Sequence, residues 1–119
     1  MGKRSRRRGA ETLKAPESEY RSPEGDMLAL RGALSPAARE RYAATMQGSP
    51  LSREDAWQRA TELLFELLAV RWVIAGAEPI VRQKELLGRY RFASQDERRW
   101  IRDVLREHLA EHFPDVEAP

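Results

Sequence analysis

Two histidines and a glutamate lie within one turn of the predicted C-terminal helix, in the segment His108-Leu109-Ala110-Glu111-His112. Histidines four residues apart share one face of a helix, so both imidazoles can bind a single Zn²⁺ ion. The carboxylate of Glu111 can then act as a general base toward a metal-bound water. This spacing is compatible with a metal-dependent hydrolase.

The order of these residues resembles the H-x-x-E-H pattern of the inverted zinc peptidases, over five residues only. That family needs a further carboxylate ligand downstream, and here Asp115 and Glu117 are the only acids after His112. Histidine pairs on an apolar helix face are more often partly buried core residues with one hydrogen bond. We therefore predict no metal and no cofactor, and keep His108, His112 and Glu111 as a minor hypothesis.

Positive charge is concentrated in two segments, although the net charge of the chain is only +2. Residues 1–8 carry +5, residues 9–81 sum to −3, residues 82–106 to +4 and residues 107–119 to −4. Basic clusters beside acidic surfaces are typical of proteins that bind a polyanion. The candidate polyanion-binding residues are Lys3, Arg4, Arg6, Arg7, Arg8, Arg82, Arg89, Arg91, Arg98 and Arg102.

Two other interpretations compete with that of a binding patch. The last helix carries Arg99 four residues before Asp103 and Arg106 three residues after it, so its outer face can neutralise itself. A helix-turn-helix over residues 80–112 is the second interpretation. Its reading helix would begin with Asp96-Glu97, which brings negative charge close to the DNA phosphates and disfavours that motif.

Arg71 is the candidate for a buried charge. A helical projection of residues 52–76 places it in the middle of the apolar stripe. A guanidinium there must be paired or must reach solvent, and Glu85 is an available partner. The alternative is that Arg71 binds an anionic ligand or partner.

The spacing of apolar residues predicts an all-α fold of four to five helices. Two Ser-Pro pairs predict short helices over residues 23–31 and 36–47, each with a serine cap and proline in the first turn. A long central apolar helix is predicted from Ser52 to Gly76. A fourth helix follows from Pro79 to Arg91, and a capping box begins a fifth over residues 94–113.

The second half of the central helix is apolar on the side that should face water, at Phe65, Ala69 and Val73. A helix that is apolar nearly all round must be covered on several sides. Either the short helices cover this interface stripe or a second subunit does, so a homo-oligomer is one expected arrangement.

The domain boundaries follow from composition. Residues 1–20 are predicted to be a disordered basic arm, residues 21–113 a helical domain and residues 114–119 a short acidic tail. The chain has no cysteine, which excludes disulfides and cysteine zinc sites, and it has no apolar run long enough for a membrane. We expect a cytoplasmic location. Phosphate loops and serine nucleophile elbows are absent.

The leading hypothesis is a non-enzymatic accessory protein that associates with nucleic acid or a ribonucleoprotein through the arm and the basic patch. The alternative is a helical protein-interaction or homodimerisation module that binds no nucleic acid. A metal-dependent hydrolase built on residues 108–112 is a third hypothesis. These classes differ in a measurable way, because only the first predicts binding that weakens steeply with salt.

Overall fold

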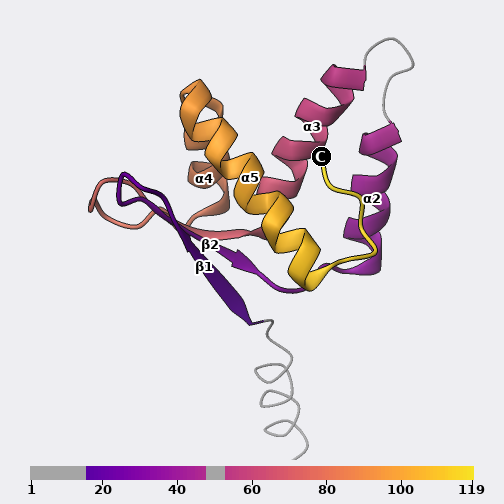
Figure 1. Ribbon diagram of the computed structural model, residues 1–119, viewed down its shortest axis with the longest axis horizontal. Coiled ribbons are helices and arrows are strands. Elements are labelled where there is room, and N and C mark those ends of the chain that lie inside the picture. The colour runs from indigo at the N-terminus through magenta and orange to yellow at the C-terminus, as the bar shows by residue number, and fades with distance from the viewer. Residues whose placement is uncertain (1–15, 48–52) are drawn as a thin grey trace, which may run out of the picture.

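The computed structural model of the protein describes residues 16–47 and 53–119. Within these residues lie three strands and four helices: β1 (Glu17–Arg21), β2 (Met27–Arg31), α2 (Pro36–Gln47), α3 (Arg53–Leu68), β3 (Ala69–Val73), α4 (Gln83–Arg91) and α5 (Gln95–His112). The strands form one antiparallel sheet in the order β1-β2-β3, and the helices lie on one side of it (Figure 1). The all-α prediction is therefore wrong, because the fold combines helices with a sheet.

β1 and β2 form a hairpin whose turn extends from Ser22 to Asp26. The Ser22 N–H donates to the Asp26 carbonyl over 2.9 Å, and the Asp26 N–H donates to the Ser22 hydroxyl over 3.0 Å. Gly25 has a φ of +93°, a conformation open to glycine and strained for other residues. The helix predicted over residues 23–31 is absent, because a serine followed by proline suits the start of a turn as well as the start of a helix.

β3 follows α3 without a loop, so the predicted central helix of residues 52–76 is in fact a helix followed by a strand. Valine and tryptophan dominate the strand, and both residue types favour extended backbone. β3 pairs with β2 on one edge, and Trp72 pairs with Ile80 on the other. The all-round apolar pattern thus arises from a buried helix end joined to a paired strand. Ser52 lies outside the described residues.

The other helix predictions agree better with the structure. α2 spans residues 36–47 as predicted, and the Ser35 hydroxyl accepts from the Ala38 N–H over 3.0 Å. α5 begins with the predicted capping box, in which Ser94 and Glu97 exchange side-chain to backbone hydrogen bonds of 3.1 and 2.9 Å. α4 begins at Gln83 rather than Pro79, because the residues before it pair with β3.

The core lies between the sheet and the helices. Leu28 and Trp72 are fully buried on the helix side of the sheet. The Phe65 ring of α3 meets Trp72 edge-on at 5.6 Å between centroids and stacks on Tyr90 of α4 at 4.9 Å. α5 closes the same side over β1, where His108 lies 5.6 Å from the Tyr20 ring. Tyr42 of α2 belongs to the same cluster, so the sheet and all four described helices share one core.

The segment after α5 returns past α2 (Figure 1). Tyr42 of α2 donates its hydroxyl hydrogen to the Glu117 carbonyl over 2.6 Å, and Arg39 pairs with Asp115 over 3.0 Å. The predicted tail of residues 114–119 is thus packed against α2. The predicted arm of residues 1–20 overlaps β1, which begins at Glu17, while residues 1–15 lie outside the described residues.

Candidate functional site

The corner between α4 and α5 exposes an aromatic ring. The Phe92 N–H bonds to the Arg89 carbonyl over 3.1 Å, which fixes the backbone at the end of α4. The Phe92 side chain is nevertheless 88% exposed, far more than any other large apolar residue of the described chain. Burying a phenylalanine is worth roughly 1.5–3 kcal/mol, so leaving one in water costs stability that a binding function can explain.

Arg98 of α5 lies beside this corner. Its Nη2 donates to the Arg91 carbonyl over 2.8 Å, and its guanidinium lies 5.2 Å from the centroid of the Tyr90 ring. Burial raises the pKa of the Tyr90 hydroxyl, although the charge of Arg98 acts in the opposite direction. Neither partner is anionic, so the positive charge of Arg98 stays available to a ligand.

Two other arginines of the predicted patch are paired with carboxylates. Arg91 binds Glu62 of α3 through Nε at 3.2 Å and Nη2 at 2.7 Å, and this hydrogen bonding raises the pKa of the Arg91 guanidinium. Arg89 pairs with Glu97 over 2.7 Å and lies over the Trp72 ring. Burial alone would raise the pKa of Glu97, but hydrogen bonds from Arg89 and from the Ser94 backbone outweigh it and lower the pKa.

The predicted patch is therefore only partly free. Arg82 and Arg102 have no ion pair within residues 16–47 and 53–119, and Arg98 has only neutral partners. Arg99 pairs with Asp96 over 3.3 Å rather than with Asp103 as predicted. Lys3, Arg4, Arg6, Arg7 and Arg8 lie outside the described residues.

The sign of the charge differs between the two parts of the chain. Of its 21 basic and 19 acidic residues, 15 and 18 lie in the described part, which carries a formal charge of −3. A hollow of about 630 Å³ beside the hairpin turn adds to this acidity, because Asp26, Asp96 and Asp103 line it. This acidic hollow is unfavourable for a polyanion, and Arg98 and Arg102 of α5 do not line it.

Arg71 lies in β3 and not on a helix. Its Nη1 bonds Glu17 over 2.9 Å and its Nη2 bonds Glu19 over 3.2 Å, on the face of the sheet opposite the helices. The three side chains cross the sheet above Ala29, which is fully buried beneath them. Arg71 is thus paired with two residues of β1 and not with Glu85, and its side chain is partly exposed instead of buried.

His108 is fully buried and uses both of its ring nitrogens. Its Nε2 lies 2.8 Å from the Arg31 carbonyl, and its Nδ1 lies 2.8 Å from the Tyr20 hydroxyl. Because a carbonyl oxygen only accepts, the proton of the neutral ring must lie on Nε2, and Nδ1 accepts from Tyr20. Burial lowers the pKa of His108.

The neighbouring histidine also contacts β1, through one ring nitrogen. His112 Nε2 lies 3.0 Å from the Ser18 hydroxyl, and the two imidazole rings are 4.5 Å apart. Over the described ranges there is no group of three metal-binding side chains that could hold an ion, and Glu111 points into solvent. The two histidines tie β1 to α5, and this geometry lends no support to the hydrolase hypothesis.

The three predicted interface residues do not share a face. Phe65 lies at the end of α3 and is fully buried, and Ala69 begins β3 and is buried too. Val73, at the end of β3, is half-buried. The chain itself covers the first two, so these residues give no reason to require a second subunit.

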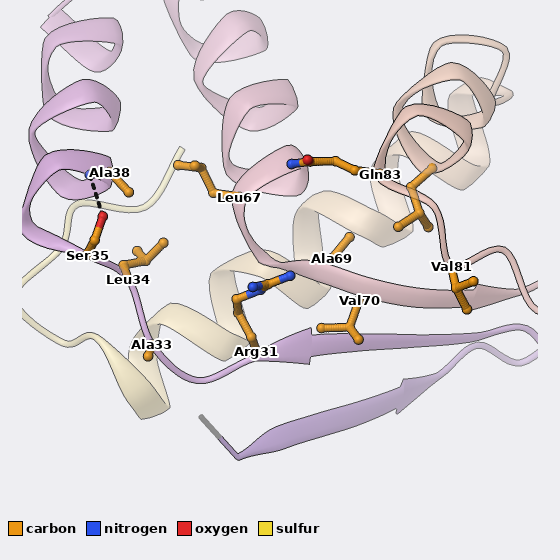
Figure 2. Close-up of a pocket in the computed structure, with 11 residues that line it drawn as sticks. Arg31, Ala33, Leu34, Ser35, Ala38, Leu67, Ala69, Val70, Val81 and Gln83 are labelled. Atoms are coloured by element: carbon orange, nitrogen blue, oxygen red, sulfur yellow. Dashed lines mark hydrogen bonds between the residues drawn. The ribbon is translucent and has the colours of Figure 1, made fainter. Parts of the chain in front are cut away.

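A second candidate site is a cleft of about 470 Å³ between α2, α3 and the start of α4 (Figure 2). Its walls are mostly aliphatic, and the side chain of Arg31 extends into it from the end of β2 (Figure 2). Arg31 has no ion pair with any acid of the described residues.

Comparison with family models, with curated proteins and with solved structures gave no match. The helices in the described residues are all too short or too polar to cross a membrane.

Sequence reasoning missed Phe92 and Arg31. A signal existed for Phe92, which is an aromatic residue in a turn between two arginine-rich segments. No local signal existed for Arg31, because its position at a cleft depends on β2, which the sequence pattern predicted as helix.

Proposed function

We propose that the chain is a non-enzymatic accessory protein that binds single-stranded nucleic acid at the corner between α4 and α5, assisted by its basic arm. The observation that carries this proposal is the exposed ring of Phe92 next to the free charge of Arg98. Aromatic rings that stack on bases, combined with arginines that contact the backbone, are the usual elements of single-strand binding.

The corner and the arm would make different contributions. Arg98 and Arg102 are four residues apart on α5, so both lie on the flank that begins at Phe92. They can contact successive phosphates while one base stacks on the ring. The described part is net negative, so long-range attraction would come from the basic residues of the arm, through release of counterions from the nucleic acid. A cytoplasmic location belongs to this proposal, since the chain has no cysteine to oxidise.

A protein partner that docks on Phe92 is the second candidate, because exposed aromatic residues are also common anchors of protein interfaces. Salt separates the two candidates. Binding of a nucleic acid weakens steeply with rising salt, whereas an apolar protein contact changes little.

The test is fluorescence anisotropy with a labelled single-stranded RNA and the full chain. Phe92→Ala should weaken binding by about 1–3 kcal/mol, the usual worth of one stacked base, while Phe92→Trp should keep it. Trp57→Ala is the matched control, because Trp57 is a partly exposed aromatic residue on α3. Equal affinity of the wild type and Phe92→Ala would refute the corner as the binding site.

A further inference from the structure

The cleft beside Arg31 has the size and composition of a small-molecule site. Its volume of about 470 Å³ falls within the range of ligand pockets, roughly 300–1,000 Å³. Leu34, Leu67 and Val70 supply aliphatic walls (Figure 2), and Leu86 of α4 also lines the cleft. A pocket of this kind takes an apolar body and orients it with few polar groups.

Arg31 forms no ion pair among the described residues, although an acid lies next to it in the sheet. Strand register places Glu17 of β1 directly opposite Arg31 of β2. The Glu17 carboxylate accepts from Arg71 Nη1 over 2.9 Å and forms no ion pair with Arg31. The Arg31 side chain turns toward the cleft, between Ala33 and Ala69 (Figure 2).

A hydrogen bond holds the backbone of Arg31, so the point from which its side chain enters the cleft is defined without a ligand. Its carbonyl accepts from His108 Nε2 over 2.8 Å, which ties the end of β2 to α5. Ser35 on the opposite wall uses its oxygen to accept from the Ala38 N–H, which leaves the hydroxyl hydrogen free to donate. The cleft thus offers an exposed arginine that is anchored through its backbone, and one hydroxyl donor, beside aliphatic side chains.

From this arrangement we propose that the cleft binds a small aliphatic carboxylate, with its head group on Arg31 and its chain against the leucine and valine walls. A guanidinium binds a carboxylate through two parallel hydrogen bonds. A single positive charge matches a singly charged head group, whereas a phosphate ester would leave a second negative charge without a partner. This site is separate from the corner at Phe92 and does not depend on the proposed function.

The experiment is an NMR titration of the full, isotope-labelled chain with octanoate. Amide shifts at Leu34, Val70 and Gln83 should saturate as the cleft fills. Octanol, with the same chain and no charge, should bind at least about tenfold more weakly, since a charge-assisted hydrogen bond is worth more than a factor of ten. Octyl phosphate should also bind less tightly than octanoate.

Two variants and a control assign the site. Arg31→Gln should reduce octanoate affinity at least about tenfold, and Ala38→Leu, which fills the cleft from α2, should abolish binding. Arg41→Gln is the control, because Arg41 is an exposed arginine of α2 whose guanidinium has no ion pair among the described residues. Shifts absent from the cleft, equal affinity for octanol, tighter binding of octyl phosphate or full affinity in Arg31→Gln would each overturn the proposal.

Discussion

At the scale of the residue, His108 shows how a histidine pair with metal-ligand spacing can serve structure instead. The ring joins two strands to α5, through the Tyr20 hydroxyl on β1 and the Arg31 carbonyl on β2. In the neutral ring the proton lies on Nε2, which donates to the carbonyl, and Nδ1 accepts from the tyrosine hydroxyl. The same contact fixes the backbone of Arg31, so the histidine also supports the cleft.

The buried histidine makes stability depend on pH. Burial lowers the pKa of His108 from its ordinary value of 6.5, so the unfolded chain binds more protons than the folded chain below that pH. The contribution of His108 is complete above about pH 6.5 and is lost as the pH falls through its folded-state pKa. The slope should approach about 1.4 kcal/mol per pH unit.

Urea denaturation at a series of pH values between 7.5 and 5 measures this slope. The charged groups that act on His108 are His112 and Glu111. His108→Gln cannot titrate, so it should flatten the curve. An unchanged slope in that variant would assign the pH dependence to another group.

At the scale of the element, the boundaries that were predicted correctly are those with a local cause. α2 and α5 begin at serines that cap the first turn, and such caps are visible in the sequence. The errors at residues 23–31 and 69–76 have a non-local cause. The apolar run of β2 is helix-compatible on its own, and it becomes a strand because β1 and β3 pair with it on both edges.

A glycine-to-alanine substitution at two positions tests the backbone conformation of the hairpin turn and of α4. Gly25 holds a φ of +93° in the turn and Gly88 lies within α4, and an added methyl group meets no atom within 4 Å at either site. Gly25→Ala should destabilise the protein by about 1 kcal/mol through backbone strain. Gly88→Ala should stabilise it by roughly 0.5–1 kcal/mol, because alanine favours helix.

Thermal denaturation of the two variants gives this comparison. A shift of the same sign at both positions would contradict the turn geometry of residues 22–26.

At the scale of the whole molecule, charge is divided unevenly between the described residues and the rest of the chain. The net +2 of the chain combines a described part of −3 with a basic remainder. Two arginines of the predicted patch form internal ion pairs, Arg89 with Glu97 and Arg91 with Glu62. Sequence spacing revealed the arginines, but not which of them meet a carboxylate, because those partners come from other elements.

The same limit explains the candidate sites. The α4–α5 corner is formed by one contiguous segment. Its arginines were predicted for that reason, and Phe92 could have been predicted from the same stretch of sequence. The cleft is made by segments around residues 31–38, 67–70 and 81–86, which meet only once the sheet has formed. Because the sequence pattern did not predict the sheet, it could not predict that these three segments form one cleft.

The most direct test of the central claim is the salt dependence of binding to a single-stranded RNA, measured for the full chain and for a chain without residues 1–9. For single strands each neutralised phosphate contributes about −0.7 to the slope of log K against log salt. If the five basic residues of the arm each contact a phosphate, their removal should make the slope shallower by up to about 3.5. Equal slopes for the two chains, or no binding at low salt, would contradict the account.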